Sequence, residues 1–154
     1  MGELTYISGD LFSAPEDSIL VHACNTLRSW GAGIALAFRD RYPTQFTLYK
    51  AHCKEHGQSL LGTCLLIPGD KDHIACLFTS RAYGKRKDKP EEILVATRSA
   101  VQDLVRQNRD GKLLHACRFN SGKFGVPWEM TEAVLTEIDT TMTIYTPANE
   151  SASV

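Results

Sequence analysis

Residues Ser18–Cys24 read SILVHAC, and apolar side chains stand at most positions of this run. In an extended chain, alternate residues point to opposite faces of a sheet, so Ile19 and Val21 share one face while Leu20 and Cys24 share the other. A strand that is mostly apolar on both faces is typical of the centre of a sheet that helices cover on both sides. We therefore predict that this run is a central strand of an α/β domain.

The rest of the chain alternates strand-like and helical patterns around this run. Other strands are expected at Leu4–Ser8, Thr63–Pro68, Ile74–Thr79, Leu113–Phe119 and Met142–Tyr145. Helices are expected at 34–42, 44–57 and 89–107, with a last one that begins beside Pro127 and buries Met130, Val134 and Ile138. The order predicts a single three-layer α/β/α domain over residues 1–154, with a mixed central sheet of about six strands and a short flexible tail from about 147.

Composition narrows the class of protein. The 154 residues are 43% hydrophobic and 23% charged, with a formal net charge of −1, so we expect neither a nucleic-acid-binding surface nor a membrane surface. The chain shows neither a signal peptide nor an apolar run of about 18 residues. The cysteines are Cys24, Cys53, Cys64, Cys76 and Cys117. They are odd in number and form no Cys-x-x-Cys pair, which argues against a disulfide framework or a structural zinc site and favours a reduced, intracellular protein. We also expect a monomer.

Two glycine-containing loops follow predicted strands, and each runs into a helix. They are Asn25–Ala35, which reads NTLRSWGAGIA, and Asn120–Trp128, which reads NSGKFGVPW. Ligands of open α/β sheets bind at the carboxyl ends of the strands, where glycines allow close approach and a helix N-terminus favours an anion. Together the loops could clasp a diphosphate, although each loop could also be only a tight connection.

Several named motifs are incomplete. The run at Gly31–Leu36 lacks the third glycine of a dinucleotide fingerprint, and no P-loop occurs. The run at His52–His56 reads HCKEH, which matches a zinc peptidase pattern but has no evident third ligand, so we predict no metal site and no cofactor. The basic run at Lys85–Lys89 is interpreted as a solvated loop.

His22 is the titratable residue most suggestive of chemistry. It lies near the end of the predicted central strand, beside the first glycine loop. Imidazole titrates near neutral pH, so it could act as a general base or as a nucleophile toward phosphorus. The structural alternative is a core histidine whose hydrogen bonds are satisfied.

These segments together resemble the macro domain family, and within it the yeast-type ADP-ribose 1''-phosphate phosphatases. The resemblance extends from Thr5 to Thr146, and the segment at Asn120–Trp128 is its most specific part. It implies a macro domain fold and a phosphatase that hydrolyses ADP-ribose 1''-phosphate to ADP-ribose and phosphate, with ADP-ribosylated proteins as a further class of partner. It assigns catalysis to His22, where many macro domains have Asn.

The resemblance also implies the roles of the binding residues. Asp10 would accept a hydrogen bond from the adenine amino group, with the Leu11 amide nearby, and Asn25 would hold hydroxyls of the distal ribose. The two loop backbones would cradle the diphosphate and the distal end, and Tyr145 would border the adenine. The complete set implied for substrate binding is Gly9, Asp10, Leu11, Ala23, Cys24, Asn25, Trp30, Gly31, Ala32, Gly33, Ile34, Ala35, Phe119, Asn120, Ser121, Gly122, Lys123, Phe124, Gly125 and Tyr145.

Two alternative functions share this pocket. One is a non-catalytic reader of ADP-ribosylated proteins. The other is an enzyme that removes ADP-ribose from protein side chains. In the subfamily that acts on glutamate, the positions of the catalytic Lys and the catalytic Asp correspond to places near Ser80 and Phe124 of this chain, and neither of these residues can take over the role. Here, too, His115–Phe119 replaces a Met-Pro segment that usually precedes the second loop.

Overall fold

The computed structural model describes residues 2–147, so most of the predicted tail lies outside the described residues. Within this range the chain forms six strands and four helices in the predicted order. Three single-turn 3₁₀ helices lie between them, the first at Leu11–Ser13. In chain order the main elements are β1 (Leu4–Ser8), β2 (Ile19–Asn25), α1 (Gly33–Arg41), α2 (Pro43–His56), β3 (Cys64–Ile67), β4 (His73–Ser80), α3 (Pro90–Gln107), β5 (Leu114–Cys117), α4 (Trp128–Glu137) and β6 (Met142–Thr146).

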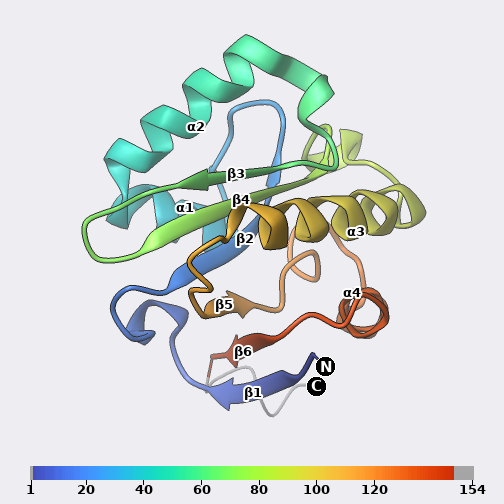
Figure 1. Ribbon diagram of the computed structural model, residues 1–154. Helices are drawn as coiled ribbons and strands as arrows, with labels where there is room; N and C mark the ends of the chain where they lie inside the picture. The colour runs from blue at the N-terminus through green and yellow to red at the C-terminus, as the bar shows by residue number, and fades with distance from the viewer. Residues whose placement is uncertain (1, 148–154) are drawn as a thin grey trace.

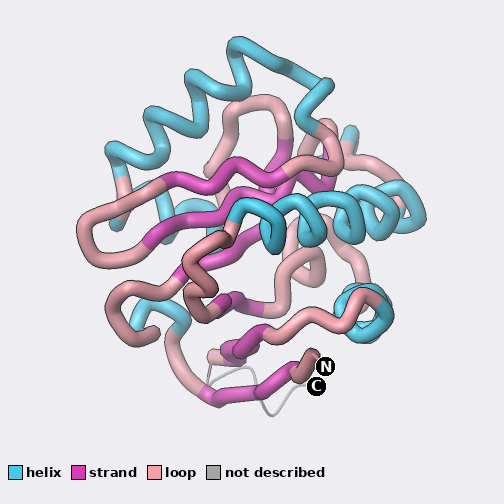
Figure 2. Tube along the Cα trace, in the orientation of Figure 1, coloured by secondary structure: helices cyan, strands magenta, loops and turns pink. Residues whose placement is uncertain are grey.

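The strands form one mixed sheet in the order β1-β6-β5-β2-β4-β3 (Figures 1 and 2). Five strands run parallel to one another, and β3 runs antiparallel to its neighbour β4. Because the five parallel strands point the same way, their carboxyl ends meet at one edge of the sheet. This arrangement confirms the predicted three-layer α/β/α class.

Helices cover both faces of the sheet: α3 crosses in front of it in Figure 1, and α1 lies behind it. Ile19 and Val21 pack with residues of α3 and α4 in one core, whereas Leu20 and Cys24 pack with Phe38 of α1 in the other. The two-sided burial expected of β2 is confirmed. No helix within residues 2–147 has both the length and the apolar character needed to span a bilayer.

Helix α4 buries a different face from the one that its apolar spacing predicts. Its buried side chains are Trp128, Thr131 and Leu135, while Met130 is 46% exposed. The reason is tertiary, because Trp128 packs edge-to-face on Phe119 and the Thr131 hydroxyl lies in a buried hydrogen-bond network.

Candidate functional site

Three loops converge at the carboxyl edge of the sheet, following β2, β4 and β5. A β-carbon added at Gly33 would lie 3.9 Å from Cγ of Lys123, which brings the two glycine loops side by side. A β-carbon at Gly125 would lie 3.7 Å from Cε of Lys87, in the loop that follows β4. Thr26 ties the first loop to the third, since its hydroxyl donates to the carbonyl oxygen of Arg81 at 2.7 Å. The predicted convergence of the glycine loops is therefore present.

The first loop is held in shape by Asn25, at the end of β2. Its amide oxygen accepts from the backbone N–H of Leu27 at 2.9 Å, and its amide nitrogen donates to the carbonyl of Ser29 at 2.9 Å. The hydroxyl of Tyr49 donates to the Asn25 backbone carbonyl at 2.7 Å. The Asn25 side chain is thus buried and engaged within the loop, where the resemblance implies contact with ribose hydroxyls.

The N-terminus of α1 is open to an anion. The chain enters the helix through Gly33, whose φ of 60° lies in the left-handed region that glycine tolerates best. Gly31, Ala32 and Gly33 are exposed, and the first turn carries neither a side-chain cap nor an acidic residue. The first amides of a helix have no partners within the helix, so they are available to a phosphate oxygen.

Asn120 anchors the second loop. Its amide group accepts from the hydroxyl of Thr79 at 3.0 Å and donates to those of Thr97 at 2.9 Å and Thr131 at 3.3 Å, which links the loop to β4, α3 and α4. Its backbone has a φ of 70°, which Asn tolerates better than most residues. Beyond this anchor the loop is exposed at Ser121, Gly122, Lys123 and Gly125.

A pocket of about 310 Å³ lies beside these loops at the ends of β1, β5 and β6. Asp10 contributes the acidic group, and one of its carboxylate oxygens accepts from the Phe12 amide at 3.0 Å. The hydroxyl of Tyr145 lies 3.0 Å from Nδ1 of His115, and burial raises the pKa of this tyrosine. The residues that line the pocket are Gly9, Asp10, Leu11, Ile34, Cys117, Tyr145 and Pro147.

The sequence missed Cys117 and Pro147 as pocket residues. Cys117 is the last residue of β5 and Pro147 directly follows β6, at the edge that receives ligands, and proximity to a strand end is the signal that could have identified them. Five implied substrate-binding residues line the pocket: Gly9, Asp10, Leu11, Ile34 and Tyr145.

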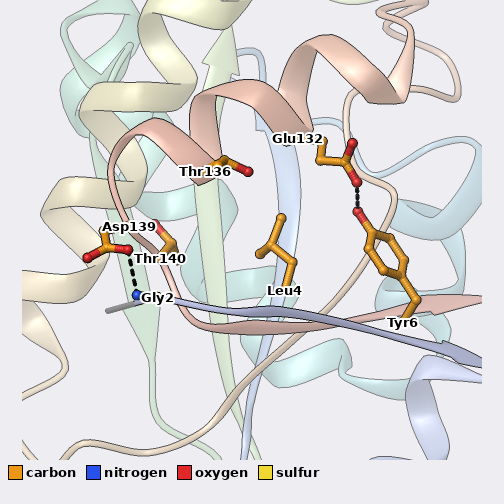
Figure 3. Close-up of a pocket in the computed structure, with 7 residues that line it drawn as sticks. All are labelled: Gly2, Leu4, Tyr6, Glu132, Thr136, Asp139 and Thr140. Atoms are coloured by element: carbon orange, nitrogen blue, oxygen red, sulfur yellow. Dashed lines mark hydrogen bonds between the residues drawn. The ribbon is translucent and has the colours of Figure 1, made fainter.

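A second hollow of about 370 Å³ lies between β1 and α4 (Figure 3). Tyr6 donates a hydrogen bond to Glu132 there, and the backbone amide of Gly2 donates to the Asp139 carboxylate. None of the sequence-predicted site residues lines it. Its size is therefore a poor guide to function, and the smaller pocket beside the loops is the better candidate.

His22 lies in the core beneath the first loop, fully buried, and does not line the pocket. Its ring stacks on Phe38 at 4.0 Å between centroids and meets Trp30 edge-on at 4.9 Å. Its two ring nitrogens lie 3.7 Å and 3.6 Å from Sγ of Cys24. Burial alone raises the pKa of the Cys24 thiol, but hydrogen bonding to Cys76 and the proximity of His22 outweigh it and lower this pKa.

The substrate-binding residues that the resemblance implies differ in their exposure to solvent. The exposed members are Asp10, Gly31, Ala32, Gly33, Ser121, Gly122, Lys123 and Gly125. The half-buried members are Gly9, Ala23, Ile34, Ala35 and Phe124. The buried members are Leu11, Cys24, Asn25, Trp30, Phe119, Asn120 and Tyr145. Trp30, Cys24 and Phe119 belong to the two hydrophobic cores, so their side chains shape the site from below.

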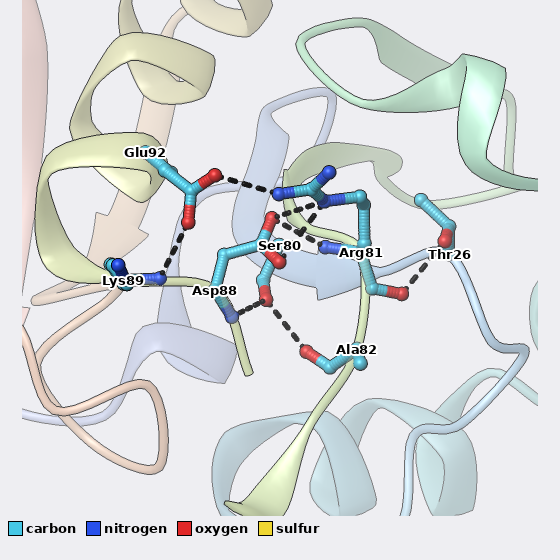
Figure 4. A network of polar contacts seen from close by, with 7 residues as sticks. All are labelled: Thr26, Ser80, Arg81, Ala82, Asp88, Lys89 and Glu92. Atoms are coloured by element: carbon cyan, nitrogen blue, oxygen red, sulfur yellow. Dashed lines mark hydrogen bonds and ion pairs between the residues drawn. The ribbon is translucent and has the colours of Figure 1, made fainter. Parts of the chain in front are cut away.

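A polar network fixes the third loop (Figure 4). The Asp88 carboxylate is buried, accepts from the backbone N–H of Arg81 at 3.0 Å and pairs with its guanidinium at 3.1 Å. The hydroxyl of Ser80 accepts from the Asp88 amide and donates to the carbonyl of Ala82. The interpretation of 85–89 as a solvated loop holds for the exposed Lys85–Lys87 but is wrong for Asp88, the one acid in the run.

Known proteins resemble this chain over most of its length. The family model of the macro domain matches residues 21–135. An ADP-ribose 1''-phosphate phosphatase of Chaetomium globosum is 44% identical over 86% of this chain and 82% of its own length, and one of Candida albicans is 40% identical over 88% and 94%.

Solved structures agree in fold. The macrodomain of Mycobacterium tuberculosis DarG is 30% identical, with a TM-score of 0.73 over 96% of this chain and 99% of that one. Thermosipho africanus DarTG in complex with ADP-ribose is 17% identical, with a TM-score of 0.77 over 97% of this chain and 43% of that one. The shared fold, the glycine loops at the carboxyl edge and the family match lead to one conclusion: this chain belongs to the macro domain family.

Proposed function

We propose that this protein hydrolyses the phosphate monoester of ADP-ribose 1''-phosphate to give ADP-ribose and phosphate. The observation that carries the proposal is the meeting of two glycine loops and the Asp10 pocket at one sheet edge. Relatives 36–44% identical bear the name of this activity. The reaction is a phosphoric monoester hydrolysis, and no motif in the chain calls for a cofactor.

In this proposal the adenine occupies the pocket of about 310 Å³. Asp10 is exposed at its rim, so its carboxylate can accept from the adenine amino group while it also accepts from Phe12. Leu11 and Ile34 supply apolar walls, and Tyr145 closes one side. A flat heterocycle fits such a lining, since small-molecule pockets combine apolar walls with few polar groups.

The diphosphate and the distal phosphate lie between the two glycine loops. The amides of the first turn of α1, which no side chain of the described residues caps, face this position from one side, and the Ser121–Gly125 backbone faces it from the other. The exposed Lys123 adds a positive charge beside Gly33. Donors fixed in this way stabilise charge that develops on the phosphoryl oxygens in the transition state.

His22 is the proposed catalytic residue. As a base it would take a proton from the attacking water while the P–O bond to ribose breaks, and the resulting imidazolium would return a proton to the departing ribose oxygen. As a nucleophile it would form an N–P bond as the same P–O bond breaks, and water would then cleave the N–P bond to release phosphate. Its ring lies behind Trp30 and Phe38, so either role requires α1 or the loop before it to shift when substrate binds.

The setting that we propose is an intracellular monomer that acts on a free nucleotide. All five cysteines are free thiols, as expected in a reducing compartment. ADP-ribosylated proteins are the alternative partners, because they present the same nucleotide to the same pocket.

Phosphate release from ADP-ribose 1''-phosphate, measured beside an ADP-ribosylated protein, tests the proposal. We expect release of phosphate from the nucleotide and none of ADP-ribose from the protein. Binding of ADP-ribose without turnover of either substrate would instead identify a reader module. Release of ADP-ribose from the protein alone would identify a hydrolase with a rearranged site.

A further inference from the structure

Three side chains that can bind a soft or borderline metal ion meet in the core between β2 and α1. His22 and Cys76 are register partners on the neighbouring strands β2 and β4, and Cys24 lies two residues beyond His22 on the same face. One ligand atom from each side chain lies within 4.8 Å of the other two. All three side chains are at most 2% exposed. The site arises from strand pairing, which is why no linear motif predicts it.

The spacing suits a shared metal ion. Zinc binds thiolate sulfur at about 2.3 Å and imidazole nitrogen at about 2.0–2.1 Å, so a tetrahedral angle places S and N about 3.6 Å apart. Sγ of Cys24 lies 3.6 Å from Nε2 and 3.7 Å from Nδ1 of His22. The separation is that of two ligands on one ion, but Sγ lies almost equally far from both nitrogens and therefore faces the ring, so the imidazole must rotate to direct one nitrogen lone pair at a shared ion.

The surroundings favour a neutral complex. Phe38 and Trp30 pack on the imidazole, and Tyr49 and Phe78 belong to the same core. An isolated charge is costly in such a shell, but two thiolates balance the two positive charges of a zinc-class cation, and the imidazole adds none. A monovalent soft ion would leave one negative charge unbalanced here.

The indole N–H of Trp30 gives an independent indication. It is buried and faces the sulfur of Cys24, toward which it donates only weakly, since no acceptor in the described part of the chain meets full hydrogen-bond geometry. Its ring lies 4.9 Å from that of His22. Buried donors rarely stay unpaired, and a metal-bound thiolate is a stronger acceptor than a thiol. Outer donors of this kind orient and stabilise metal ligands.

We propose that His22, Cys24 and Cys76 form a buried site for a thiophilic divalent cation of the zinc class. Because the site is closed to solvent, the ion enters while the chain folds or while α1 is displaced. Occupancy would engage His22 and stop phosphate release, a consequence that rests on the proposed function. Binding itself does not depend on that function and is measured separately.

The test loads the reduced protein with Zn²⁺ during refolding, removes weakly held ion by gel filtration and measures bound zinc per chain. Titration with Cd²⁺ then reports thiolate ligation through its ultraviolet charge-transfer absorption. All proteins carry His56→Gln, since the rings of His52 and His56 lie 4.6 Å apart on the surface and could hold zinc themselves. We expect one zinc per chain, a thiolate band and a higher melting temperature.

Cys76→Ala should weaken zinc binding by about 100-fold or more, since even loss of an outer-shell partner costs 10–100-fold. Cys64→Ala is the matched control, because Cys64 is also a buried strand cysteine but belongs to the opposite core. It should keep one zinc per chain. Equal zinc binding by Cys76→Ala and its parent, or a parent without a thiolate band, would overturn the proposal. Should Cys76→Ala fail to fold by circular dichroism, Cys76→Val, which fills the same space, decides in its place.

Discussion

The Asp10 side chain has a structural role and a proposed binding role, and two different substitutions distinguish them. Its side chain caps the 3₁₀ helix at Leu11–Ser13 by accepting from the Phe12 amide at 3.0 Å, and the same carboxylate stands at the rim of the proposed adenine pocket. Asp10→Ala removes both contacts. Asp10→Asn keeps an oxygen that can cap the helix but removes the negative charge that the adenine amino group would meet.

The expected magnitudes differ for the two contacts. A hydrogen bond to a charged group contributes about 1.5–3 kcal/mol, which is roughly 10- to 150-fold in Kd. Loss of an N-cap costs about 0.5–2 kcal/mol, and the exposure of Asp10 and the three-residue helix place it near the lower end. Affinity should therefore fall from wild type to Asn to Ala, whereas the free energy of unfolding should fall only in Asp10→Ala.

Titration calorimetry with ADP-ribose and with AMP measures the binding effect, and urea unfolding measures stability. Both ligands carry adenine, so both should lose affinity by the same factor, while kcat for phosphate release stays near wild type. The reasoning is refuted if kcat collapses with KM unchanged, because Asp10 would then act at the phosphate. Unchanged AMP affinity would equally exclude adenine from this pocket.

Three further predictions follow from the loops and the core. His22→Asn should lower phosphate release by about 10²–10⁴-fold and leave ADP-ribose affinity within a few-fold, measured by phosphate assay and calorimetry. Gly122→Val should fold normally but abolish measurable ADP-ribose binding, because within residues 2–147 no other heavy atom lies within 4 Å of the added β-carbon, which the ligand would therefore meet. Gly33→Val should in addition lower the free energy of unfolding in urea by about 1–2 kcal/mol, because it strains a φ of 60°. Asn120→Ala should lose about 1–3 kcal/mol of unfolding free energy, since it removes the acceptor of the buried Thr79 hydroxyl and the donor to the buried Thr97 hydroxyl.

Each of these has a clear contrary result. Near wild-type phosphate release by His22→Asn would make the histidine purely structural. Normal ADP-ribose affinity in a folded Gly122→Val would contradict the two-loop clasp. Asn120→Gly is the control for the backbone at that position, because glycine relieves the positive φ but restores no hydrogen bond; stability equal to wild type in either Asn120 variant would remove Asn120 as the anchor.

The sequence by itself determined the order of strands and helices, the two-sided burial of β2 and the family. These features depend on local periodicity or on contiguous motifs, so neighbouring residues are enough to carry them. The Asn120–Trp128 segment was correctly predicted as a loop that runs into a helix, for the same reason: adjacent residues specify a loop and the helix that follows it.

Only the tertiary structure decided which side chains meet. The pairing of β2 with β4 sets His22 against Cys76, residues 54 positions apart, and no local pattern encodes that register. The burial of individual side chains could not be predicted either, since Phe38 of α1 covers His22, and Asp88 is buried although it lies in a basic run. Helix α4 buries its Trp128 side because Trp128 packs edge-to-face on Phe119, in the segment that follows β5. Contacts between elements depend on packing across the whole domain, and that is why they could be read only from the folded chain.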